Sequence, residues 1–193
     1  LNAMDNVRHF AENNFKKETE IYRHWHDFAA SNLYGIEIND QIARVCKMNM
    51  IIHDDGHTNV ISLDSLENFE KIEEKHKKFS SDSFDLILTN PPFGATIKKS
   101  EKNYLSLYEL GKNGNKERDN QKTEILFIER CIKFLKPKTG KMAIVLPDGI
   151  LTNGSLQYVR NYLMEQCQLL AIVSLPQFAF THYGAGVKSS LVF

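Results

Sequence analysis

Residues 84–95 read FDLILTNPPFGA, and this stretch decides the predicted fold. Apolar β-forming residues open it and run directly into Asn90, Pro91, Pro92 and Phe93. The two prolines fix their own φ angles near about −65° and disfavour the α conformation in the residue before each. We therefore expect a buried strand that ends in a stiff loop carrying a polar amide and an aromatic ring.

Strands and helices alternate on both sides of this stretch. Apolar runs bounded by turn residues predict the strands, and apolar residues at helical spacing predict the helices. Alternation of this kind is typical of a doubly wound α/β layer with a mostly parallel sheet, and the last strand, which has no room for a crossover, should run antiparallel. Asp40 and Thr123 are the expected caps of two helices. The expected strands lie within 33–40, 58–66, 84–89, 141–147, 169–176 and 187–193, and the expected helices lie within 1–30, 41–53, 123–135 and 155–167.

Two carboxylates stand at the ends of the first two predicted strands. Ligands of such sheets bind beyond the carboxyl ends of the strands, so these side chains are candidate ligand contacts. Glu37 could accept hydrogen bonds from ribose hydroxyls, and Asp64 could accept one from an adenine amine. The alternatives are equally open: Glu37 could be a solvated carboxylate, and Asp64 could cap a turn.

The loop after the third predicted strand has a more specific chemistry. The side-chain oxygen of Asn90 and a proline carbonyl could accept both hydrogens of an amine on a planar base, while Phe93 stacks on the base. Such acceptors draw the nitrogen lone pair out of conjugation, so that it can attack an electrophilic methyl group without a metal or a protein nucleophile. The alternative is an ordinary turn, since Asn and Pro are common turn residues.

Several stretches together resemble one enzyme family. LTNPPFG at 88–94 looks like motif IV of amino-methyltransferases that use S-adenosylmethionine, in the NPPF form associated with adenine methylation. LYGIEINDQIARVCKMNMIIHDDG at 33–56 is similar to the second motif of the modification (methylation) subunit of type I restriction-modification systems, and MAIVLPDGIL and LPQFAFTHYGAGVKSSLVF look like its later motifs. The resemblance implies a Rossmann-like fold and methyl transfer to the N6 amine of adenine in DNA.

The same resemblance implies which residues bind S-adenosylmethionine. The implied set is Glu37, Ile38, Asp64 and Asn90, with Glu37 on the ribose and Asp64 on the adenine. The family's glycine-rich cofactor loop, Asp-x-x-Cys-Gly-x-Gly, and the strand before it are absent. We therefore expect 1–193 to be one methyltransferase catalytic domain that begins downstream of that loop. Its sheet should lack the strand between those ending at Glu37 and Asn90, and alone it should bind the cofactor poorly and be inactive.

The resemblance also implies the partners of the chain. Asn90, Pro91 and Pro92 would hold the target amine, with Phe93 stacked on an adenine flipped out of double-stranded DNA. A separate specificity subunit would supply most of the sequence recognition, and a restriction subunit could accompany it. The alternatives are methylation of a protein glutamine or an RNA base, or an inactive remnant that serves as a binding module.

Composition sets limits on these interpretations. The 193 residues are 42% hydrophobic and 25% charged, and their formal net charge is +0, so contacts with nucleic acid must rest on local patches or a second subunit. No apolar run is long enough to span a membrane. Cys46, Cys131 and Cys167 form no CxxC pair, which argues against a disulfide framework and a zinc site and favours a reducing cytoplasm.

Three further features leave alternatives open. Histidines and aspartates in RHWHDF and HDDGH suggest a metal site, but no partner set completes one, so we expect none. The polar stretch 98–122 is expected to be a long loop that either contacts DNA or is merely solvated. Phe178, Phe180 and Tyr183 could wall the base pocket or pack in the core.

Overall fold

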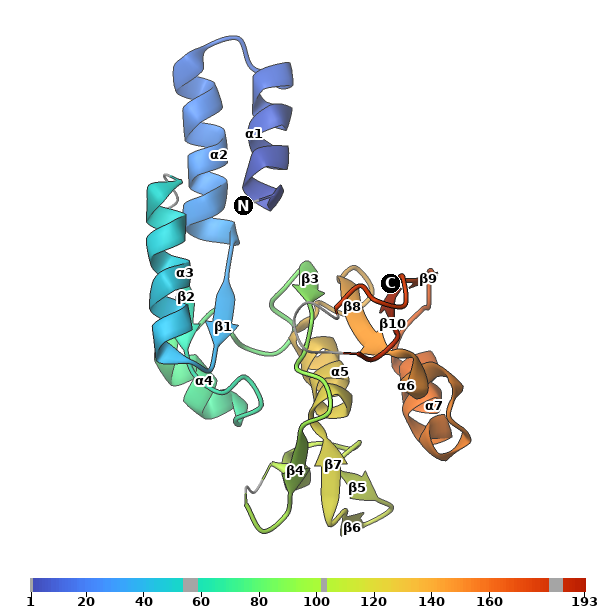
Figure 1. Ribbon diagram of the computed structural model, residues 1–193. Helices are drawn as coiled ribbons and strands as arrows, with labels where there is room; N and C mark the ends of the chain where they lie inside the picture. The colour runs from blue at the N-terminus through green and yellow to red at the C-terminus, as the bar shows by residue number, and fades with distance from the viewer. Residues whose placement is uncertain (1, 54–58, 102–103, 181–185) are drawn as a thin grey trace. The chain divides into compact units, whose positions relative to one another are not determined.

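Two compact units make up the chain in the computed structural model, and each is described by itself (Figure 1). The first unit contains Leu1–Glu67 and Glu74–Lys77, and the second contains Asn68–Glu73 and Lys78–Phe193. The structure describes residues 2–53, 59–101, 104–180 and 186–193.

The first unit begins with a helical hairpin. Helices α1 (Asn2–Asn14) and α2 (Glu18–Asn32) run antiparallel (Figure 1), where one or two amphipathic helices were predicted for the first thirty residues. Their apolar faces meet because each carries apolar residues at helical spacing. The buried cluster that results consists of Met4, Trp25, Ala29 and Met50.

A short βαβ unit follows the hairpin. Strand β1 (Gly35–Glu37), helix α3 (Asp40–Ile52) and strand β2 (Val60–Ser62) occur in this order, and the two strands pair in parallel. The register sets Glu37 opposite Ser62, so both strands end at the same edge. This confirms the first two predicted strands and the helix between them.

The second unit contains a four-stranded sheet in the order β3-β8-β10-β9. Strand β3 pairs with β8 in parallel, and β10 runs antiparallel to both β8 and β9. Three of the four strands therefore run in one direction, and the last strand of the chain runs against them, as predicted. The strands are β3 (Leu86–Thr89), β8 (Lys141–Pro147), β9 (Ile172–Ser174) and β10 (Ser189–Val192).

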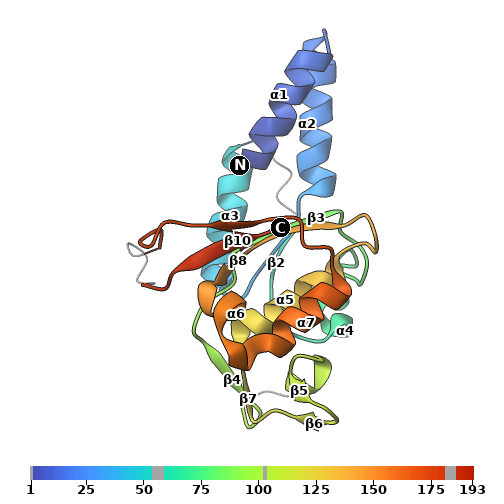
Figure 2. The same cartoon turned by 90° about the vertical axis from the view of Figure 1, so that its right-hand side faces the viewer.

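Helices cover one face of this sheet (Figure 2). Apolar side chains of α5 (Thr123–Phe134) and α7 (Gln157–Gln166) pack on alternate residues of the central strands, because successive side chains of a strand point to opposite faces. The short helices α4 (Phe69–Lys75) and α6 (Asp148–Thr152) and the 3-10 turn η2 (Gly154–Leu156) complete the connections. The buried cluster includes Ile125, Ile128, Ile144, Leu146, Val159 and Val192.

Both predicted helix caps are wrong. Asn39, not Asp40, caps α3, because its side-chain oxygen accepts the N–H groups two and three residues ahead. Helix α5 has Lys122 at its cap position without a side-chain hydrogen bond. The hydroxyl of Thr123 donates instead to the carbonyl of Ala95, 3.1 Å away, so a tertiary contact has replaced the local cap.

The stretch 98–122 was predicted to be a long loop that either contacts DNA or is merely solvated, and the prediction of a loop without regular structure is wrong. Strands β4 and β7 pair at its base, and strands β5 and β6 form a hairpin near its tip. Tyr104, Leu105, Tyr108 and Leu110 are buried, and Leu110 belongs to the buried cluster between the helices and the sheet of this unit. Its elements are β4 (Thr96–Lys98), the 3-10 turn η1 (Leu105–Leu107), β5 (Lys112–Asn113), β6 (Lys116–Glu117) and β7 (Asn120–Lys122). We call residues 96–122 the insert.

Within the described residues, β1 pairs only with β2, and β3 pairs only with β8. Each of these strands therefore has one edge without a hydrogen-bonded neighbour in its own unit. The expected additional strand between those ending at Glu37 and Asn90 stays a prediction.

Candidate active site

The loop that follows β3 is the first part of the candidate site. Strands β3 and β8 are parallel, so this loop emerges at the edge of the sheet where β8 also ends. Asn90 is exposed, and no part of the chain that the structure describes holds its side chain in a hydrogen bond. Pro91 is buried and Pro92 is exposed, so the first proline anchors the loop while the amide faces solvent.

Gly94 turns the chain out of this loop. Its φ is +80°, a conformation that residues with a Cβ rarely adopt. No neighbouring atom lies within 4 Å of the position that a Cβ would take, so backbone conformation and not space requires glycine here. The carbonyl of Ala95 then accepts two hydrogen bonds from Thr123, one from its backbone N–H at 3.0 Å and one from its hydroxyl at 3.1 Å. The loop is thus fixed at both ends.

The same loop contributes one ring to an aromatic pair. The ring of Phe93 meets the ring of Phe180 edge-on, with 6.3 Å between ring centroids and 84° between ring planes. Both side chains are half-buried. Phe178 is 72% exposed, so core packing is excluded for this residue. Tyr183, the third aromatic residue considered for a pocket wall, lies outside the described residues.

Polar contacts tie together the three strand ends next to this loop, and the sequence analysis did not predict them. The N–H of Asp148, just past β8, donates to the carbonyl of Lys188, and the hydroxyl of Ser190 in β10 donates to Asp148 Oδ1 at 2.7 Å. The ammonium of Lys188 donates to Ser174 Oγ at 2.7 Å and to the carbonyl of Leu175. The small polar pair Ser189-Ser190, unusual in a buried strand, was the available signal.

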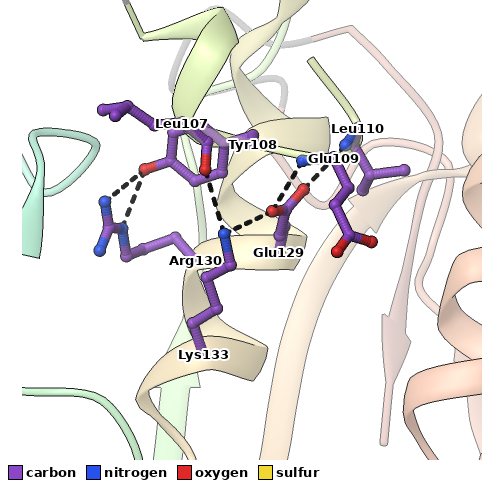
Figure 3. A network of polar contacts seen from close by, with 7 residues as sticks. All are labelled: Leu107, Tyr108, Glu109, Leu110, Glu129, Arg130 and Lys133. Atoms are coloured by element: carbon purple, nitrogen blue, oxygen red, sulfur yellow. Dashed lines mark hydrogen bonds and ion pairs between the residues drawn. The ribbon is translucent and has the colours of Figure 1, made fainter. Parts of the chain in front are cut away.

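The insert is attached to α5 by a buried network (Figure 3). The Glu129 carboxylate is fully buried and accepts the N–H groups of Glu109 at 2.9 Å and Leu110 at 2.8 Å. Lys133 lies 2.7 Å from the same carboxylate, and Arg130 donates twice to the hydroxyl of Tyr108. These contacts hold the insert as a folded element that follows the Asn90 loop in the chain.

The two candidate carboxylates of the first unit lie at the ends of its parallel strands. Glu37 ends β1, is half-buried, and accepts the N–H of Asn39 at 2.8 Å with one of its oxygens. Asp64 follows β2 and accepts the N–H of Leu66 at 3.1 Å, so the turn that was an alternative for this residue is present. Ile38 is 63% exposed.

These residues fit the nucleoside part of S-adenosylmethionine. A carboxylate offers about four acceptor sites, so one hydrogen bond at Glu37 leaves capacity for ribose hydroxyls, and an exposed Ile38 offers an apolar surface to a base.

Within the described ranges, no three His, Cys, Asp or Glu side chains are grouped to hold a metal ion. Asp54, Asp55 and His57 lie outside these ranges.

Comparison with known proteins identifies the family. A family model for N-6 DNA methylases matches residues 10–193. The chain is 31% identical to the type I restriction enzyme EcoEI methylase subunit of Escherichia coli over 194 residues, which are 99% of this chain and 34% of that protein. It is also 31% identical to the MpnII methylase subunit of Mycoplasma pneumoniae, over 77% of this chain and 28% of that protein. The chain thus spans about a third of the length of these relatives.

Solved structures agree on the fold. The methyltransferase subunit of a type I restriction-modification system from Streptococcus thermophilus matches with a TM-score of 0.66 and 20% identity, over 98% of this chain and 42% of that one. A class I S-adenosylmethionine-dependent methyltransferase from Listeria monocytogenes, itself described as putative, matches with a TM-score of 0.64 and 14% identity, over 98% and 58% of the two chains. The fold is therefore that of an S-adenosylmethionine-dependent methyltransferase, and the chain belongs to the N-6 DNA methylase family.

Proposed function

We propose that the protein of which these residues form part methylates the N6 amine of adenine in DNA. The observation that carries this proposal is the exposed Asn90 amide in a loop that is fixed at both ends and also carries Phe93, in a chain of the N-6 DNA methylase family. A preorganised acceptor stabilises charge in a transition state without the cost of reorganisation.

The target amine is held by acceptors of the second unit. The side-chain oxygen of Asn90 and the carbonyl of Pro91 accept the two N6 hydrogens, which raises the electron density on nitrogen for in-line attack. S-adenosylmethionine, when bound, supplies the electrophilic methyl group. Bond formation between N6 and the methyl carbon would break the carbon–sulfur bond of the cofactor, which would leave as S-adenosylhomocysteine, and N6 would release one proton to solvent. Phe93 would stack on the base and offset part of the cost of flipping it out of the duplex.

The same proposal assigns four residues to the cofactor. Glu37 accepts hydrogen bonds from the ribose hydroxyls, Asp64 accepts one from the adenine amine, Ile38 packs on the adenine face, and Asn90 borders the methyl group. We further propose that the methionine end of the cofactor is bound by a glycine-rich loop outside 1–193, because the 193 residues contain no Asp-x-x-Cys-Gly-x-Gly sequence. The 193 residues alone should then bind the cofactor weakly and transfer no methyl group, which calorimetry would test.

Partner subunits are part of the same proposal. The relatives are methylase subunits of type I restriction enzymes, and the formal net charge of this chain is +0. We therefore propose that a specificity subunit supplies most contacts with double-stranded DNA and that a restriction subunit completes the assembly.

In the described residues no helix is long and apolar enough to cross a membrane. We propose the cytoplasm as the site of action, because all three cysteines are free thiols.

Transfer of labelled methyl groups tests the function. The complete gene product, with its specificity subunit, is incubated with labelled S-adenosylmethionine and unmethylated DNA. Label should enter DNA, and N90A should abolish this. The matched control is N49A, at an exposed asparagine of α3, which should keep the wild-type rate. Label on protein or RNA but not on DNA would overturn the substrate, and no transfer to any acceptor would favour a binding module.

A further inference from the structure

Lys188 lies directly before β10, at the edge of the sheet where β8 ends. Its ammonium donates to Ser174 Oγ at 2.7 Å and to the carbonyl of Leu175. The backbone fixes the same place, because the N–H of Leu175 donates to the carbonyl of Ser189 at 3.1 Å. The end of β9 is therefore held twice, once by the sheet and once by a side chain.

The backbone of Lys188 is itself anchored to the neighbouring strand end. Its carbonyl accepts the N–H of Asp148 at 2.9 Å, and the carboxylate of Asp148 accepts the hydroxyl of Ser190 at 2.7 Å. Since β8 is paired in parallel with β3, the strand that leads to Asn90, the position of Lys188 is set from the catalytic side of the sheet.

The segment that Lys188 holds leads to the aromatic pair. After Leu175 the chain turns, with the N–H of Ala179 donating to the carbonyl of Pro176 at 3.1 Å. The next residue, Phe180, meets Phe93 edge-on. A proline with a fixed φ and a hydrogen-bonded turn leave little freedom between Leu175 and Phe180. The direction in which the chain leaves Leu175 therefore determines where the ring of Phe180 stands.

We propose that Lys188 is a positioning residue for the base-binding aromatic ring. The ammonium group of Lys188 fixes the direction in which residues 175–180 leave the sheet. This direction places the Phe180 ring against the Phe93 ring, and the contact keeps the Phe93 ring in the orientation that stacks on the target base. The effect on methyl transfer rests on the proposed function, whereas the effect on the two rings does not. This allows two independent tests.

The first test measures the rings in the 193-residue chain. Isotope-edited NMR records the contact between the Phe93 and Phe180 rings and the ring-current shift of Phe93. K188M should lose both, K188R should retain them because a guanidinium can donate to both acceptors, and K141M, at an exposed lysine of the opposite strand end, should leave them unchanged. Retention of the wild-type contact and shift in K188M would overturn the proposal.

The second test measures transfer by the complete gene product. K188M should lower kcat/KM for DNA by about tenfold, mainly through KM, the size expected when a stacking contact is weakened. K188R should recover most of the loss. The double variant K188M/F180L should have a kcat/KM no lower than that of the less active single variant, because both changes act through the Phe93 ring. Additive losses of kcat/KM in the double variant, or an unchanged KM in K188M, would contradict a positioning role. If the wild type methylates no DNA, the proposed function fails, while the NMR result still decides the role of Lys188.

Discussion

Phe93 and Phe180 face each other edge-on across the end of the sheet, 6.3 Å apart at their ring centroids. An edge-to-face pair of this kind contributes about 0.5–1.5 kcal/mol beyond the area it buries, and it restricts the rotation of each ring. The contact with Phe180 therefore limits the orientations of the half-buried Phe93 ring, which favours stacking on a flat base.

Replacing Phe93 should therefore weaken base binding more than folding. F93L should lower kcat/KM for DNA by roughly tenfold to a hundredfold, since stacking of a base on an aromatic ring is worth about 1–3 kcal/mol. F93Y keeps the π face and should stay within about threefold of the wild type. Steady-state kinetics with short duplexes measures both variants, and equal losses in F93L and F93Y would argue against stacking.

Gly94 should be sensitive to any side chain. G94A places an L-residue at φ +80° and should lower the free energy of unfolding by about 1–2 kcal/mol, although no atom obstructs the added methyl group. G149A is the matched control: Gly149 lies in α6, an added Cβ there also meets nothing within 4 Å, and alanine favours the helix by about 1 kcal/mol. Urea denaturation compares the two, and an unchanged stability of G94A would contradict the conformational argument.

The buried carboxylate of Glu129 should be required for the insert. In E129Q, one of the two carboxylate oxygens becomes an NH2 group, which faces a backbone N–H and cannot accept its hydrogen bond, so one of the two bonds to the insert is lost. The ion pair with Lys133 is lost as well, because the amide carries no charge. We expect the free energy of unfolding to fall by about 2 kcal/mol and proteases to cut within the insert. E165Q, at an exposed glutamate of α7, should stay within about 0.5 kcal/mol of the wild type.

The three cysteines should differ in reactivity. Burial raises the pKa of the Cys131 thiol to about 12, against a smaller opposing effect of Arg130, and burial also raises the pKa of Cys167. Cys46 is exposed. At pH 8, iodoacetamide should therefore label Cys46 first, Cys167 slowly and Cys131 only after unfolding, as read by mass spectrometry. Labelling of native Cys131 as fast as Cys46 would show that the thiol is not buried.

The same pKa of Cys131 has a consequence for stability. The ordinary pKa of a cysteine thiol is 9.0, so above pH 9 the unfolded chain releases the proton of Cys131 while the folded state keeps it. The unfolded state therefore binds fewer protons than the folded state in this pH range, and stability falls as the pH rises. The contribution of Cys131 is complete below pH 9 and is lost as the pH rises toward 12. C131A should flatten the decline of unfolding free energy between these pH values.

The sequence predicted the strands and helices whose signal is local. Lys141–Pro147 is continuously apolar after its first residue and was predicted with its observed bounds, and the loop at Asn90 was placed correctly at the end of β3. The helix caps were wrong because Asn39 and Asp40 are both good caps, and because the hydroxyl of Thr123 is taken by Ala95, which is distant in sequence.

The rest depended on contacts across the chain. Leu105 and Tyr108 of the insert have helical spacing, but over a single turn, and the strands around them have two or three residues, too few to show a period. The pair of Asp148 and Ser190 joins residues 42 positions apart, and Lys188 reaches back to Leu175. Such contacts leave no periodic signal in one sequence.

The nature of the methylated product tests the central claim most directly. DNA incubated with the complete gene product, its specificity subunit and S-adenosylmethionine is digested to nucleosides and analysed by mass spectrometry. The account predicts N6-methyladenine in the wild-type reaction and none with N90A. N4-methylcytosine or 5-methylcytosine as the product, or N6-methyladenine at wild-type yield in N90A, would contradict it.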